Sequence, residues 1–67
     1  MLLITKPNIA DADGFYARLL ATHKGLTEAQ SHALNARLVL VLANHVGDAG
    51  VLTQALDLAR DGADQSA

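Results

Sequence analysis

The segment 27–48, TEAQSHALNARLVLVLANHVGD, constrains the fold more than any other part of this chain. It opens with a helix start signal, because Thr27 can cap the first turn while the Gln30 side chain reaches back to the Thr27 backbone. It closes with Gly47 and Asp48, a helix stop followed directly by a cap for another helix. Between these signals the run LVLVLA is apolar on nearly every side, so this helix must be surrounded by other protein.

Two amphipathic segments flank this helix. The first is predicted over Asp13 to Lys24, ends before Gly25, and carries on one face Phe15, Tyr16, Leu19, Leu20 and His23. The second is predicted over Ala49 to Arg60, and Gly62 is expected to end it. The tight reversal at Gly47 and Asp48 predicts that this last helix folds back antiparallel to the central one.

Together these signals predict an all-α fold, a helical hairpin plus a third helix in a three-helix antiparallel bundle. The predicted domain spans 13–61, between an extended N-terminal arm at 1–12 and a flexible polar tail at 62–67. Pro7 interrupts the arm shortly after the apolar run Leu2-Leu3-Ile4. The apolar residues are mostly leucine, alanine and valine, a composition that favours helices over strands.

The chain is small for the apolar surface that it carries. It has 67 residues, of which 51% are hydrophobic, and a domain of this size usually needs an additional source of stability. There is no cysteine, which excludes a disulfide and a thiolate metal site and fits a cytoplasmic protein. The remaining sources of stability are tight helix packing, a bound ligand and oligomerisation.

Charge and motif content argue against several classes of function. The formal net charge is −2, so there is no basic excess to neutralise nucleic-acid phosphates. No apolar run reaches the roughly 18 residues of a membrane span, and the N-terminal run is too short for a signal peptide. The glycines fall at helix ends and not in a phosphate-binding loop. We therefore predict no cofactor, no nucleic acid and no membrane partner.

The helical wheel of the central helix separates two apolar seams. We call the first the bulky seam; it ends near His45 and consists of Leu34, Leu38, Val41 and Leu42. We call the second the alanine seam; it permits close approach of another backbone and consists of Ala29, Ala33, Ala36, Leu40 and Ala43. If the bulky seam serves both flanking helices, the alanine seam is left for a partner. Alternatively, the flanking helices lie on opposite sides and use both seams.

A polar stripe borders the alanine seam, because Gln30, Arg37 and Asn44 recur every seven residues. The stripe is either a solvated edge or a partner contact, in which arginine pairs with a carboxylate and asparagine fixes the register. We favour the contact. The predicted protein interface therefore comprises Ala29, Ala33, Ala36, Arg37, Leu40, Ala43 and Asn44.

The three histidines are the only candidates for metal chemistry. His23 and His32 could approach across the first turn with Glu28 nearby, but the usual i, i+4 ligand pair of helical zinc sites is absent. His23 and His45 lie in last turns, where their rings can instead bond terminal carbonyls. Ser31 and His32 are neighbours that point apart on a helix, which does not form a catalytic pair. We predict neither a metal site nor catalytic residues.

The sequence resembles a family of short bacterial proteins known as domain of unknown function 2783. The resemblance covers roughly Asp13 to Arg60 and is carried by Phe15-Tyr16, His23-Lys24-Gly25-Leu26, Leu34-Asn35-Ala36-Arg37-Leu38 and Leu42-Ala43-Asn44-His45-Val46-Gly47-Asp48. It implies no assigned activity. It indicates a specific contact, or a ligand or polar site, at Asn35, Arg37, Asn44 and His45. Through gene context it also implies a link to flavin-dependent hydroxylases of aromatic-compound breakdown.

Two functions from different classes follow. The first is a non-catalytic accessory subunit that associates through the central helix and the apolar arm, either with itself or with a larger enzyme such as a flavoprotein. The second is a module that binds a small ligand or a metal through His23, His32 and Glu28, or through His45 with Asn44. We expect the first.

Overall fold

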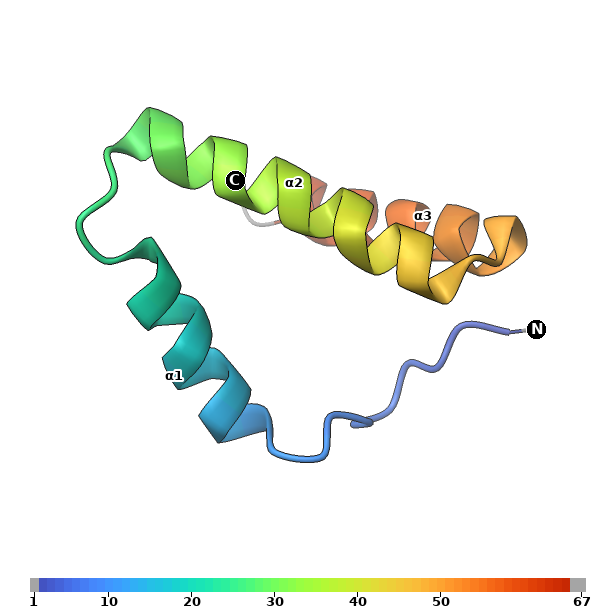
Figure 1. The fold of residues 1–67 in the computed structure, drawn as a ribbon. Helices are drawn as coiled ribbons and strands as arrows, with labels where there is room; N and C mark the ends of the chain where they lie inside the picture. The colour runs from blue at the N-terminus through green and yellow to red at the C-terminus, as the bar shows by residue number, and fades with distance from the viewer. Residues whose placement is uncertain (1, 66–67) are drawn as a thin grey trace.

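The fold contains three helices and an extended arm. The computed structural model describes residues 2–65, in which the helices are α1 (Ala12–His23), α2 (Glu28–Val46) and α3 (Ala49–Gln65), and no strand occurs. Residues 2–9 precede α1 as an extended segment (Figure 1). The prediction of an all-α, three-helix chain with an N-terminal arm is confirmed.

Side chains cap the beginning of each helix. The Gly14 N–H donates to Asp11 Oδ1 at 3.0 Å at the start of α1, and the Val51 N–H donates to Asp48 Oδ1 at 3.0 Å at the start of α3. Thr27 forms the predicted capping box with Gln30 at the start of α2, with hydrogen bonds of 3.0 and 3.1 Å. These bonds satisfy backbone N–H groups that have no partner within the helix.

Glycines in the left-handed conformation end the first two helices. Gly47 has φ +75° and its N–H donates to the Ala43 carbonyl at 2.9 Å, which ends α2. Gly25, with φ +83°, lies in the connection after α1. Because a side chain is strained at positive φ, glycine favours these two reversals over continuation of the helix.

The predicted end of the third helix at Gly62 was wrong, because α3 continues through Gly62 to Gln65. Gly62 does not have a positive φ, and nothing lies within 4 Å of the position of an added Cβ. Glycine stops a helix only when it takes the left-handed conformation; in a helical conformation it merely lowers helix stability. The predicted tail at 62–67 therefore begins inside a helix, and residues 66 and 67 lie outside the described residues.

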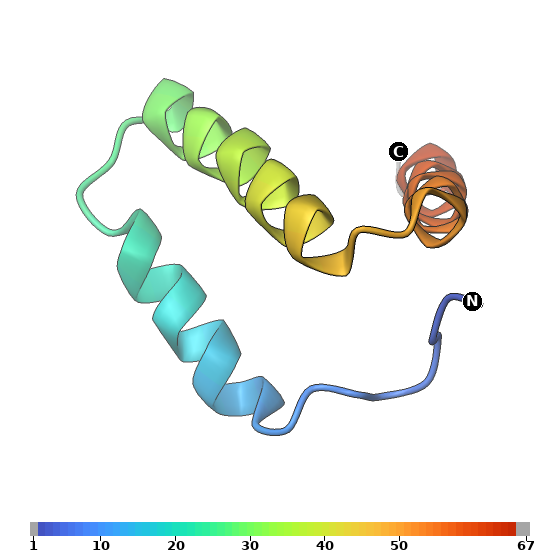
Figure 2. The same cartoon turned by 45° about the vertical axis from the view of Figure 1, so that its right-hand side comes forward.

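The helices are arranged openly. From the connection 24–27, α1 and α2 run in roughly opposite directions and spread apart (Figures 1 and 2). After the reversal at Gly47 and Asp48, α3 runs back behind α2, and Figure 2, which looks nearly along α3, shows its axis apart from that of α2. The start of the arm returns to α3, where the Leu3 N–H donates to Gln54 Oε1 at 3.3 Å.

The chain by itself has almost no core. Val51, at 9% exposed, is the only buried hydrophobic residue in the described part of the chain. The radius of gyration is 13.5 Å, whereas a compact domain of this length has one of about 11 Å. Among the described residues, no helix is long and apolar enough to cross a membrane.

Candidate functional site

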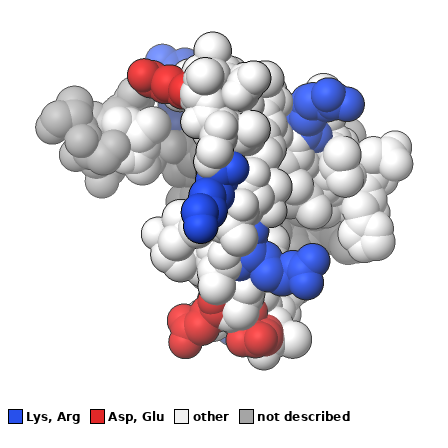
Figure 3. All heavy atoms as spheres, turned by 60° about the vertical axis from the view of Figure 1, so that its left-hand side comes forward, with Lys and Arg blue, Asp and Glu red and all other residues white. Residues whose placement is uncertain are grey.

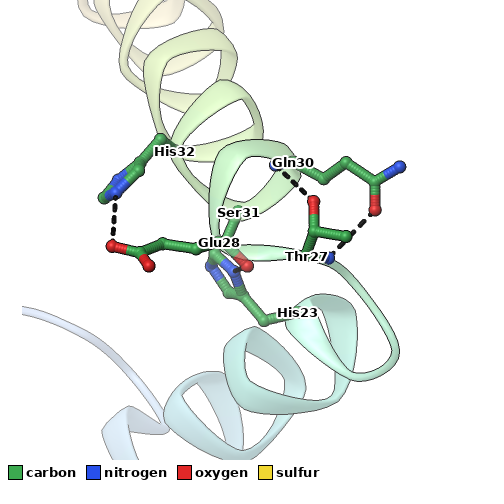
Figure 4. Close-up of polar contacts among 6 residues, drawn as sticks. All are labelled: His23, Thr27, Glu28, Gln30, Ser31 and His32. Atoms are coloured by element: carbon green, nitrogen blue, oxygen red, sulfur yellow. Dashed lines mark hydrogen bonds and ion pairs between the residues drawn. The ribbon is translucent and has the colours of Figure 1, made fainter.

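The connection between α1 and α2 is held by a cluster of three polar side chains. His23 Nδ1 lies 2.9 Å from Ser31 Oγ, and His23 Nε2 lies 3.1 Å from Asn35 Oδ1. Figure 4 shows His23 at the end of α1 pointing at the first turns of α2, where Ser31 lies. Because Asn35 Oδ1 can only accept, Nε2 carries a hydrogen, and Nδ1 of the neutral ring accepts from the Ser31 hydroxyl.

This cluster fixes the two helices relative to each other and has little of what catalysis requires. Ser31 and His23 are half-buried, and a serine, a histidine and an orienting amide are all present. Acyl transfer also needs backbone or side-chain donors aimed at a developing oxyanion, and each hydrogen bond of this cluster joins its own members. The cluster therefore acts as a clamp between α1 and α2.

The histidine and carboxylate group considered for metal binding does not assemble. His32 Nε2 lies 3.5 Å from Glu28 Oε1, but His23 turns to Ser31 and Asn35 instead of joining them. Figure 4 shows the pair of His32 and Glu28 on α2, separate from the capping box. No group of three or more histidine, aspartate or glutamate side chains that could hold a metal ion occurs among residues 2–65.

The axes of α1 and α2 diverge from their connection (Figures 1 and 2), and we call the arrangement of these two helices the wedge. Near the connection the facing side chains are half-buried: Leu19, His23, Ser31, Leu34 and Leu38. Towards the open end they are exposed, and the exposed fractions are 45% for Phe15, 50% for Leu42, 60% for Tyr16 and 64% for Val41. Exposure of the apolar residues therefore increases away from the clamp, and both aromatic residues of the chain lie in the exposed first half of α1.

The alanine seam lies on a different side of α2 and is almost entirely uncovered. Ala29, Ala33 and Ala36 are exposed, Leu40 is 70% exposed, and only Ala43, near the reversal, is half-buried. α1 occupies the direction of the bulky seam, and α3 approaches α2 near the reversal. Neither helix covers the alanine seam along its length, and only its end at Ala43 is half-buried.

The polar side chains beside the alanine seam differ in their roles. Gln30 is used in the capping box, and Asn35 in the clamp. Arg37, Asn44 and His45 are exposed, and their side chains form no hydrogen bond or ion pair with other described residues. A shallow hollow of about 470 Å³ between the connection and α2 is lined by Leu26, Gln30, Ala33, Leu34 and Arg37. Arg37 thus lies where the stripe meets the alanine seam, with its charge available to a partner.

Figure 3 shows a face on which most of the visible surface is uncharged, with basic side chains spaced over it and acidic ones mainly at its edges. A nucleic-acid interface would instead gather several basic side chains in one stripe. The basic side chains on this face do not gather in that way.

The clamp was not found from the sequence. Ser31 and Asn35 are four residues apart and therefore share one face of α2, and His23 precedes them across a short connection. That spacing was the available signal. The resemblance had indicated Asn35 as a specific contact, and the structure gives it one within the same chain.

These features define a class of protein: a small all-α chain whose helices are clamped at one end and whose apolar faces remain open. The chain belongs to the family described as "Protein of unknown function (DUF2783)", whose model matches residues 3–61. The suspected family is thereby confirmed. No curated protein and no solved structure matches the chain.

Proposed function

We propose that this chain is a non-catalytic accessory subunit that acts by binding other protein through α2. The observation that carries this proposal is the exposure of its apolar residues. Fourteen large hydrophobic side chains are at least 38% exposed, whereas one hydrophobic residue is buried in the described part of the chain. Exposed apolar surface that continues from element to element marks a protein interaction site.

The alanine seam and the neighbouring stripe are the proposed contact with a larger protein. Small side chains let a partner helix approach closely, and Leu40 supplies an apolar anchor at 70% exposure. Arg37 can pair with a carboxylate of the partner through two parallel hydrogen bonds, and Asn44 can fix the register. These are the interface residues predicted from the sequence.

We propose a flavin-dependent hydroxylase of aromatic compounds as the larger enzyme, and the cytoplasm as the compartment. Support for the enzyme comes from the gene context that accompanies the family resemblance. Support for the compartment comes from the absence of cysteine in a small chain, which is typical of a protein that does not depend on oxidising surroundings.

The test is affinity purification of the tagged full chain from its own cells, followed by identification of bound flavoproteins. The interface variant is Leu40→Asp, which places a charge on the alanine seam. The matched control is Thr53→Asp, on the exposed polar side of α3. We expect the wild type and Thr53→Asp to recover one enzyme in constant ratio, and Leu40→Asp to recover at least ten times less. Equal recovery by both variants, or no co-purified enzyme, would refute the proposal.

A further inference from the structure

We propose that a second copy of this chain closes the wedge between α1 and α2, giving a two-fold symmetric dimer with a four-helix core. The apolar faces of α1 and α2 that border the wedge meet those of the second copy, so that Phe15, Tyr16, Val41 and Leu42 of each copy contact those of the other. This inference goes beyond the proposed function, because it assigns an occupant to the bulky seam and leaves the alanine seam to another protein.

The gradient of exposure along the wedge is the first argument. Leu19, Leu34 and Leu38 are half-buried near the clamp, whereas the four residues at the open end are 45–64% exposed. Phe15 and Tyr16 belong to the apolar face of α1, and Val41 and Leu42 belong to the bulky seam of α2. A helix pair that ends in this way is half of a helical bundle, and two such pairs supply the four helices of a complete one.

The surface area is the second argument. The chain exposes 5963 Å², whereas a compact monomer of its mass exposes about 4,000 Å². The excess of roughly 1,900 Å² exceeds the ~800 Å² that each partner buries in a standard interface. This excess is shared among the wedge, the alanine seam, α3 and the arm. Less than half of it, supplied by the wedge, is enough for a dimer contact of standard size.

Charge is the third argument, and it favours the wedge over the alanine seam for self-association. The four residues at the open end are uncharged, so a two-fold contact among them places no like charges opposite each other. An antiparallel two-fold contact along the alanine seam, centred near Ala36, would place Arg37 of one copy close to Arg37 of the other. Like charges in a contact weaken it and select against that pairing.

The molar mass in solution tests the dimer. Light scattering or sedimentation equilibrium of the full chain at micromolar concentration is expected to give the mass of two chains. Leu42→Asp should raise the dissociation constant by about 30-fold or more, as expected when a central apolar contact is lost, while Thr53→Asp should leave it unchanged. A wild-type mass of one chain, or of any multiple other than two, overturns the proposal.

Single cysteines can locate the contact by cross-linking. Because the chain has no cysteine of its own, any disulfide must join the introduced residues. Val41→Cys, at the open end of the wedge, should form a disulfide-linked dimer on mild oxidation. Ala33→Cys, on the alanine seam, should remain unlinked. The reverse pattern overturns the proposed site even if the chain is dimeric. Leu40→Asp should keep the mass of two chains while losing the larger enzyme, so the two proposals can fail independently.

Discussion

His23 joins two helices through both of its ring nitrogens, which is unusual for a residue at the end of a helix. The two hydrogen bonds, of 2.9 and 3.1 Å, come from residues one turn apart on α2. A single bond would leave the ring free to rotate about its contact. Two bonds fix its orientation and thereby fix the angle at which α1 leaves α2.

Removing this ring should destabilise the chain. His23→Ala deletes both bonds and leaves the half-buried Ser31 hydroxyl without its partner, so we expect a loss of about 1–2 kcal/mol in the free energy of unfolding by urea. His32→Ala is the control, because its ion pair with Glu28 is exposed, with side chains 74% and 89% accessible. That variant should change stability by less than about 0.5 kcal/mol. Equal losses in the two variants would contradict the clamp.

Gly14 shows how a cap can restrict a glycine that lies in a helix. A Cβ at this position would overlap the Asp11 carboxylate, which caps α1 by accepting from the Gly14 N–H. Gly14→Ala should gain helix propensity of about 1 kcal/mol and lose a cap worth about the same, for a net change near zero. In an Asp11→Ala background there is no cap to lose, and the same substitution should stabilise by about 0.5–1 kcal/mol. The wild type, the two single variants and the double variant form a thermodynamic cycle, measured by urea denaturation. Additive changes in the free energy of unfolding would contradict an interaction between the cap and Gly14.

At the scale of elements, the two glycines at positions 47 and 62 look alike in the sequence but act differently. Gly47→Ala should destabilise by about 1 kcal/mol, because alanine is strained at φ +75°. Gly62→Ala should stabilise by about 0.5 kcal/mol, because Gly62 is helical with open space around it. Thermal melts of both variants at equal concentration are the measurement, and melting shifts of the same sign would disprove the assignment of these conformations.

Local chemistry explains why much of the secondary structure could be predicted from the residues. Asp11, Thr27 and Asp48 cap helices because their side-chain oxygens match backbone groups within three residues, a relation that does not depend on the rest of the fold. Gly62 could not be assigned in the same way. Whether a glycine stops a helix depends on the φ that it takes, and the sequence shows only a glycine after an amphipathic segment, without the cap residue that follows Gly47.

The arrangement of the helices was harder to predict because it depends on contacts between distant residues. Leu19, Leu34 and Leu38 belong to predicted apolar faces and are half-buried, but an apolar face does not say how far away its neighbour lies. The wedge results from the short connection 24–27 together with the clamp, and the clamp requires residues eight and twelve positions apart to meet. The surplus apolar surface was foreseen; its division between a wedge and a separate alanine seam required the structure.

At the scale of the whole molecule, stability and association should be inseparable. One buried hydrophobic residue among those described cannot offset the conformational entropy that this chain loses on folding. Burial of the apolar residues of the wedge by a second copy adds the hydrophobic stabilisation that is needed. A chain whose core lies between copies unfolds by dissociation, and its melting temperature then rises with protein concentration.

The enthalpy of unfolding determines how steeply the melting temperature rises with protein concentration. A chain of 67 residues unfolds with an enthalpy of about 50 kcal/mol, or about 100 kcal/mol for the dimer, so the melting temperature should rise by about 5 °C for each tenfold increase in concentration. Circular dichroism over a thousandfold range of concentration measures this slope. Leu42→Asp should melt at a lower temperature than the wild type at every concentration, because its dimer dissociates more readily. A wild-type melting temperature that does not change with concentration would mean that each chain is stable with its wedge open.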